Sequence, residues 1–201
     1  MSVVKLFSRI VAPDLEDIGD KYSNDEARAL HDTTYGIASD PWTQLAVMLS
    51  ALVHDVDHPG VPNSQLVKEG VPLASVYNDK SIAEQNSVDL AWELLMREEF
   101  KELRRIMYTT EREFHRFRQL MVNTVLATDI MDKDLKTLRN NRWDKAFSQN
   151  LSEDESTGDN IDRKATIVIE HLIQASDVSH TMQHWHVYRV STCRHTSFGI
   201  L

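Results

Sequence analysis

The chain has 201 residues and a formal charge of −9, from 31 acidic and 22 basic side chains, a length that suits one domain with a hydrophobic core. An acidic surface repels phosphate backbones, which argues against general nucleic-acid binding, and no apolar run approaches the roughly 20 residues of a membrane span. The single cysteine, Cys193, excludes an internal disulfide framework, and the start lacks a secretory signal, so we expect a cytoplasmic protein.

Hydrophobic periodicity is helical along almost the whole chain, which predicts a single all-α domain. An apolar segment over 1–12 is stopped by Pro13, and the polar stretch 14–40 indicates a loop or a weak helix. Helices are predicted over the ranges 42–57, 63–69, 79–97, 98–108, 111–126, 132–148 and 161–176. A polar, acidic loop is expected over 149–160, and periodicity is lost in the tail 191–201.

Three of these helices begin with recognisable sequence signals. Asp40 before Pro41 combines an N-cap carboxylate with proline at the first helical position. Ser81 and Glu84 have the spacing of a capping box, and Thr110 is expected to cap the helix that follows it.

The helix predicted over 42–57 is apolar on nearly all sides, so we expect it to be buried in the core. Its end carries four ionisable side chains in five residues: His54, Asp55, Asp57 and His58. Such groups are costly to bury unless they pair or bind metal, and residues 54 and 58, one helical turn apart, would share a face. Imidazole and carboxylate ligands together suit zinc, manganese, iron or magnesium. The cluster therefore predicts a metal site, with a capped helix end held by local hydrogen bonds as the alternative.

Two further acids follow apolar helices. Asp177 comes after the helix predicted over 161–176, and Asp129 comes after the helix predicted over 111–126. Alone, Asp177 is more often an N-cap or a satisfied buried acid, but beside the first cluster it is a candidate distant metal ligand. Asp129 is a candidate for orienting a metal-bound histidine.

These segments carry a family resemblance. The strings at 50–63, 77–84, 126–129 and 175–179 occur in the order found in class I cyclic nucleotide phosphodiesterases, a branch of the HD hydrolase superfamily, and the match covers about 43–190. The resemblance implies a compact multi-helix HD-type domain. It also implies metal-dependent hydrolysis of 3′,5′-cyclic nucleotides, cAMP or cGMP or both, to 5′-nucleoside monophosphates in cyclic nucleotide signalling.

The resemblance further implies a role for each matching residue. His54 and Asp177 would ligate a tightly held ion, commonly zinc, and Asp55 would bridge it to a second ion, magnesium or manganese. His58 would hold metal-bound water or hydroxide. Glu84 would hydrogen-bond waters of the second ion and support the proton donor. Thr128 and Asp129 would lie beside the metals. The implied partners are a cyclic nucleotide substrate and no nucleic acid, with a homodimer or fused regulatory domains in addition.

The sequence departs from the family pattern at both ends. The upstream His-Asn-x-x-His-Ala motif, which supplies a metal ligand and the general acid, is absent, and the only histidine before the metal cluster is His31. The purine-binding glutamine and stacking aromatic residue of the family lie beyond the point of departure after Val190. We therefore expect an incomplete phosphodiesterase catalytic domain over 1–190 and a non-matching tail over 191–201. The resemblance implies an enzyme by family without assigning activity to these residues alone.

Three other interpretations stay open at this point. The chain could be a non-catalytic metal-binding remnant, an HD-type phosphohydrolase acting on another nucleotide, or a purely structural helical bundle. The last leaves the four ionisable groups of the metal cluster unpaired at a helix end.

Overall fold

The computed structural model describes residues 24–147 and 158–179, and every structural statement below concerns these two ranges. Within them the chain forms helices and turns and no strand, which confirms the all-α prediction. The helices are α2 (Asn24–Thr33), η2 (Ile37–Ser39), α3 (Pro41–Val53), α4 (Asn63–Glu69), α5 (Pro72–Val76), α6 (Ile82–Met96), η3 (Glu98–Phe100), α7 (Lys101–Met107), α8 (Glu111–Leu126), α9 (Lys133–Phe147) and α10 (Gly158–Val178). The predicted segment 1–12 and tail 191–201 lie outside the described residues.

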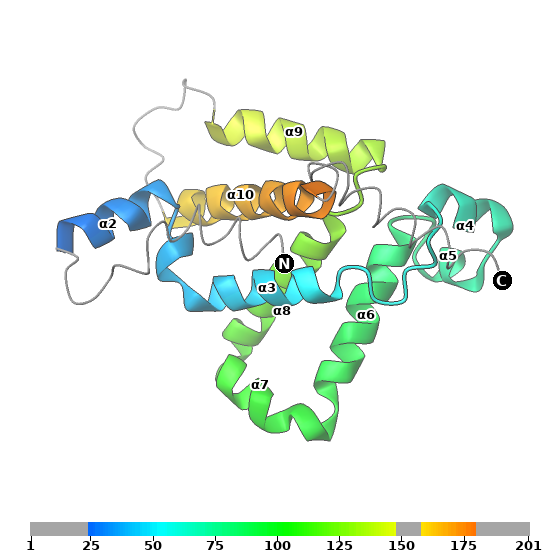
Figure 1. The fold of residues 1–201 in the computed structure, drawn as a ribbon, viewed down its shortest axis with the longest axis horizontal. Helices are drawn as coiled ribbons and strands as arrows, with labels where there is room; N and C mark the ends of the chain where they lie inside the picture. The colour runs from blue at the N-terminus through cyan, green and yellow to red at the C-terminus, as the bar shows by residue number, and fades with distance from the viewer. Residues whose placement is uncertain (1–23, 148–157, 180–201) are drawn as a thin grey trace, which may run out of the picture.

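Helix α3 is central to the packing. Its most extensive contacts are with α8, which also packs against α6 and α10. Helix α10 lies between α3 and α9, while α6 and α8 run towards the short α7 at the lower edge of Figure 1. Helices α4 and α5 pack on α6, at the right in Figure 1. The carboxyl end of α3 therefore points towards α4 and α6.

Two hydrophobic clusters meet at α3. The adjacent residues Ala46 and Val47 are both fully buried, and each belongs to a different cluster. The first cluster contains Ile37, Val47, Ala127, Ile169, Leu172 and Ile173, and the second contains Ala46, Val88, Leu95, Met107, Phe117, Met121 and Val125. Burial on both sides of one backbone fixes the rotation of α3 about its axis, and with it the direction of the side chains at its end.

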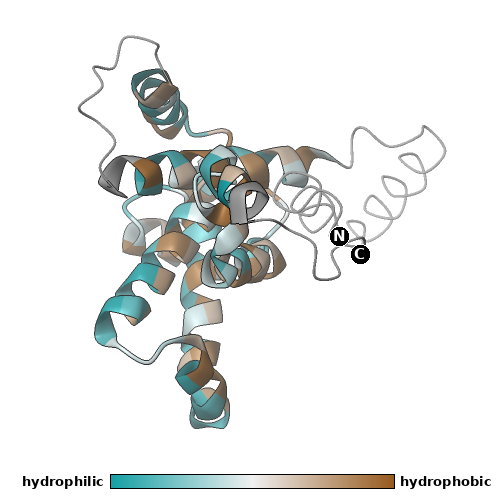
Figure 2. Cartoon of the chain, turned by 90° about the vertical axis from the view of Figure 1, so that its left-hand side faces the viewer, coloured by the Kyte–Doolittle hydropathy of each residue, from teal (hydrophilic) through white to brown (hydrophobic). Residues whose placement is uncertain are grey.

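The prediction that this helix is buried in the core is confirmed for one part of its surface only. Leu45 and Met48 are exposed, and Leu52 is 77% exposed, so they form an apolar stripe with helical spacing. Figure 2 shows both polar and apolar residues along most helices. No helix in the described ranges is long and apolar enough to cross a membrane.

The predicted N-caps at residues 40 and 110 are confirmed. The carboxylate of Asp40 accepts hydrogen bonds from the backbone of Trp42 at 3.0 Å and of Thr43 at 3.3 Å, and from the Thr43 hydroxyl at 2.8 Å. The guanidinium of Arg116 in α8 pairs with the same carboxylate at 2.7 Å. Thr110 forms a full capping box with Glu113. Asp40 therefore both starts α3 and joins it to α8.

We predict that Asp40→Ala lowers the free energy of unfolding by about 1–2 kcal/mol at pH 7. Burial raises the pKa of Asp40, but hydrogen bonds from Thr43 and the charge of Arg116 together lower it below its usual 3.8. A depressed folded-state pKa gives stability that is present above the unfolded pKa and lost as pH falls through the folded one. Urea denaturation at pH 7 and at a pH well below 3.8 checks this, and an equal wild-type-to-variant difference at both pH values would contradict it.

Candidate metal site

The three predicted metal ligands lie together. His54 is the C-cap of α3, Asp55 follows it, and Asp177 is in the last turn of α10. Nε2 of His54 is 3.2 Å from Oδ2 of Asp55 and 3.4 Å from Oδ1 of Asp177. One potential ligand atom from each residue lies within 4.8 Å of the others. Contacts of α10 with α3 and α8 bring the distant aspartate to the end of α3.

The imidazole of His54 is oriented for a cation. Its Nδ1 is 3.0 Å from the carbonyl oxygen of Ala51, and because a carbonyl only accepts, Nδ1 must carry a proton. In the neutral ring the lone pair is then on Nε2, which faces two carboxylates. That atom is buried and makes no hydrogen bond of good geometry, although both carboxylates are within ion-pair distance. A proton or a metal ion must separate these acceptors, so the donor set fits a divalent cation.

The electrostatics of the group agree with this geometry. The carboxylates of Asp177 and Asp55 raise the pKa of His54 to about 10, against the opposing effect of burial. In return, His54 lowers the pKa of Asp55, and His58 lowers it further. With no cation present, the imidazole is therefore protonated at neutral pH, and a metal ion would replace that proton.

The chain after His54 leaves the helical path. Helix α3 ends at Val53, earlier than predicted, and Asp57 has a left-handed conformation with φ 59°. The prediction that His54 and His58 share one helix face is therefore wrong. Asn86 of α6 stabilises the turn after α3, because its side-chain amide donates a hydrogen bond to the carboxylate of Asp57 at 3.2 Å.

His58 acts electrostatically on two groups of carboxylates. Its Nδ1 accepts a hydrogen bond from the backbone N–H of Gly60 at 3.0 Å, which places the ring proton of the neutral form on Nε2. The charge of His58 lowers the pKa of Asp55 and acts in the same direction on the pKa of Glu84. The charge of this histidine therefore influences both the metal group and the second group of acids.

The second group contains Glu84 and Asp129, which are only 8% and 5% exposed. The side-chain amide of Asn63 donates to Glu84 at 2.8 Å and to Asp129 at 3.2 Å. The hydroxyl of Ser81 donates to the same Asp129 oxygen at 2.8 Å. Burial raises the pKa of Glu84, Asp129 raises it further, and the bond from Asn63 opposes both. The hydroxyl of the buried Thr128 donates to the carbonyl of Val125 at 2.7 Å.

The predicted capping box at Ser81 and Glu84 is wrong, although a helix does begin there. Ser81 makes no cap hydrogen bond, and its hydroxyl donates to Asp129. Sequence reasoning also missed Asn63, although this residue ends the 50–63 string. It missed Gln174 as well, whose side chain donates to the carbonyl of Ala127 at 2.7 Å and holds α10 against the end of α8.

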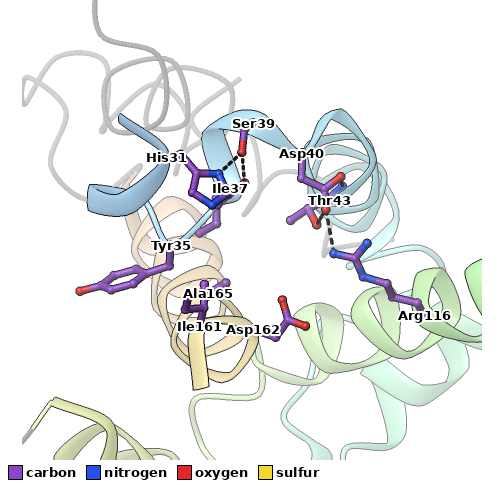
Figure 3. A pocket seen from close by; sticks show the side chains of 11 residues that line it. His31, Tyr35, Ile37, Ser39, Asp40, Thr43, Arg116, Ile161, Asp162 and Ala165 are labelled. Carbon is purple, nitrogen blue, oxygen red and sulfur yellow. Dashed lines mark hydrogen bonds and ion pairs between the residues drawn. The ribbon is translucent and has the colours of Figure 1, made fainter. Parts of the chain in front are cut away.

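A separate cavity of about 440 Å³ lies at the other end of α3 (Figure 3). Arg116, Asp40 and Asp162 line one side, and His31 bonds Ser39 on the other. Helix α3 has 13 residues and so is about 20 Å long, which separates this cavity from His54. His31 therefore belongs to a different part of the molecule from the metal group.

Comparison with known proteins identifies relatives of the chain. The family model described as 3′5′-cyclic nucleotide phosphodiesterase matches residues 28–197. A probable 3′,5′-cyclic phosphodiesterase (pde-6) of Caenorhabditis elegans is 30% identical over 141 residues, covering 70% of this chain and 17% of its own length. The human high affinity cAMP-specific and IBMX-insensitive 3′,5′-cyclic phosphodiesterase 8A is 30% identical over 181 residues, covering 78% of this chain and 21% of its own length. The chain thus spans about a fifth of the length of these relatives.

The fold also matches solved structures. The phosphodiesterase domain of the RhoPDE fusion protein from the choanoflagellate Salpingoeca rosetta superposes with a TM-score of 0.60 at 21% identity. The match covers 93% of this chain and 64% of that domain. At this identity the likeness shows a shared fold.

Proposed function

The chain belongs to the 3′5′-cyclic nucleotide phosphodiesterase family, and from this membership we propose that it acts in the metal-dependent hydrolysis of cAMP, cGMP or both to 5′-nucleoside monophosphates. The observation that carries the proposal is the His54, Asp55 and Asp177 group, in which one buried imidazole nitrogen faces two carboxylates. A role in cyclic nucleotide signalling follows from the same substrates.

We assign the metal-holding roles to these three residues. His54 and Asp177 would hold a first ion, for which zinc is our choice, and Asp55 would extend to a second, magnesium or manganese. Ions bound there supply positive charge for the phosphoryl oxygens and make water a stronger acid. The chain itself contributes orientation, because the carbonyl of Ala51 fixes the imidazole of His54 and the packing of α10 places Asp177.

The other proposed roles surround the metal group. His58, with its ring proton on Nε2, would hold the attacking water by a hydrogen bond. Buried Glu84 would bond waters of the second ion and support the proton donor. Asp129 and Thr128 would lie beside the ions and act through their neighbours. Support comes from the charge of His58, which acts on the pKa of both Asp55 and Glu84.

We also propose a cytoplasmic location and association beyond the single chain. A single cysteine in 201 residues suits a reducing compartment. The proposed associations are a second copy of the chain or fused regulatory domains. Support for the latter comes from the Salpingoeca rosetta neighbour, which is part of a fusion protein, and from the greater length of the curated relatives.

The proposal is tested by stripping metal from the purified chain and assaying it with cAMP and cGMP after adding magnesium, manganese or zinc. We expect nucleoside monophosphate to form only with an added ion, and the chelated sample to stay inactive. If the folded, metal-supplemented chain produced no more product from either nucleotide than an Asp177→Ala variant, the proposed function would be wrong.

A further inference from the structure

We propose that Asn63 is a positioning residue whose side-chain amide fixes Glu84 and Asp129 relative to each other and to the start of α6. The catalytic part of this inference rests on the proposed function, whereas the contacts themselves do not. Asn63 opens α4, 21 positions before Glu84 and 66 before Asp129, so one side chain joins three distant segments.

The contacts of Asn63 use nearly all the hydrogen-bonding groups of its side-chain amide. An asparagine side chain offers two N–H donors on Nδ2 and an acceptor on Oδ1. Nδ2 donates to Oε2 of Glu84 at 2.8 Å and to Oδ2 of Asp129 at 3.2 Å, while Oδ1 accepts from the backbone N–H of Ala83 at 3.0 Å. A side chain with donors alone or acceptors alone cannot make all three bonds, so the geometry selects an amide here.

The two N–H donors of Asn63 face two acidic side chains. Glu84 and Asp129 are both buried, and Asp129 acts on Glu84 in the direction expected of two like charges. A neutral donor shared between them offsets part of their repulsion and holds both carboxylates at fixed positions. An aspartate at position 63 would keep the size and the acceptor, but it would lose both donors and add a third acid.

The backbone next to this group is strained. Ser81 has a φ of 39°, and Asn78 and Asp79 before it also have positive φ. Residues other than glycine adopt this backbone region less often. The hydroxyl of Ser81 donates to Asp129 and accepts no cap hydrogen bond from the backbone of α6. Asn63 replaces that cap through Ala83. The cap on α6 and the positions of the two acids therefore depend on one side chain.

The test compares Asn63→Ala and Asn63→Asp with Gln65→Ala, a control on the same helix whose side chain bonds only the exposed Glu69 among the contacts described. For each full-length variant we would measure kcat and KM for cyclic nucleotide hydrolysis at saturating Mn²⁺, the affinity for Mn²⁺ by calorimetry, and the urea midpoint. We expect both Asn63 variants to lose about 10–100-fold in kcat, with KM little changed. Gln65→Ala should stay within about twofold of wild type.

A purely structural role would lower the urea midpoint and leave the kcat of the folded enzyme unchanged, and that result would overturn the inference. Asn63→Asp is the more informative variant, because it keeps an acceptor for the cap on α6 while it removes both donors and adds a third acid. In a Glu84→Ala background the further effect of Asn63→Ala on kcat should be much smaller, since one partner is gone, and full additivity would also overturn the inference.

Failure of the proposed function can be distinguished from failure of this inference. If the wild-type chain binds Mn²⁺ without hydrolysing either nucleotide, the function is wrong and the Mn²⁺ titration decides the role of Asn63. About tenfold weaker binding by Asn63→Ala would support positioning, and binding equal to wild type would refute it.

Discussion

Replacing Asp177 by alanine abolishes hydrolysis and tight metal binding in our account. The change removes one of the two carboxylates that face Nε2 of His54 and leaves the ion with fewer protein ligands. Metal catalysis is worth several kcal/mol of transition-state stabilisation, so we expect kcat/KM to fall by about 10³-fold or more. Metal content after gel filtration, measured by mass spectrometry, should fall together with activity.

The matched control is Asp162→Ala. Asp162 lies on the same helix, is exposed, and lines the cavity at the far end of α3. It should keep both metal and activity. Equal losses in the two variants would mean that acidic charge on α10, and not the position of Asp177, accounts for the effect.

The second large effect is on stability, and we expect it for Phe117→Ala in α8. Phe117 is 1% exposed, and its ring lies edge-on to the ring of Trp42 in α3, with 5.6 Å between the ring centroids. Removing a buried phenylalanine leaves a cavity and lowers the free energy of unfolding by about 3–5 kcal/mol. Many domains have only about 5–15 kcal/mol in total, so the loss would be a large part of the stability of the chain.

Urea denaturation followed by circular dichroism measures this loss. Phe114→Ala, one turn earlier on α8, is the control, because Phe114 is only half-buried while also contacting aromatic rings. Its cost should be clearly smaller. If the two variants were equally stable, the contact of Phe117 with α3 would contribute no more to stability than the contacts of Phe114.

Much of the fold could be predicted because the long helices are amphipathic or end at recognisable signals. The short helix α4 begins and ends where predicted, between Pro62 and Gly70. In contrast, α5 was missed, because its five residues are too few to show a period. The end of α3 was placed too late, since a left-handed residue such as Asp57 leaves no mark in the hydrophobic pattern.

The metal group was predictable for a different reason. Acids and histidines that follow apolar helices must be compensated, and the family resemblance connected His54 with Asp177. The contacts of Asn63 had no such signal, because an asparagine opening a short helix is an ordinary surface residue until its neighbours are known. The mistaken capping box at Ser81 has the same origin, because its hydroxyl bonds Asp129, which lies between α8 and α9 and far along the chain.

The most direct test of the metal site is anomalous diffraction from crystals of the chain grown with zinc, recorded at the zinc absorption edge. Our account predicts a peak about 2.0–2.2 Å from Nε2 of His54 and from a carboxylate oxygen of Asp177. A peak bound elsewhere, or none at this site while His54 keeps its position against Asp55 and Asp177, would contradict it.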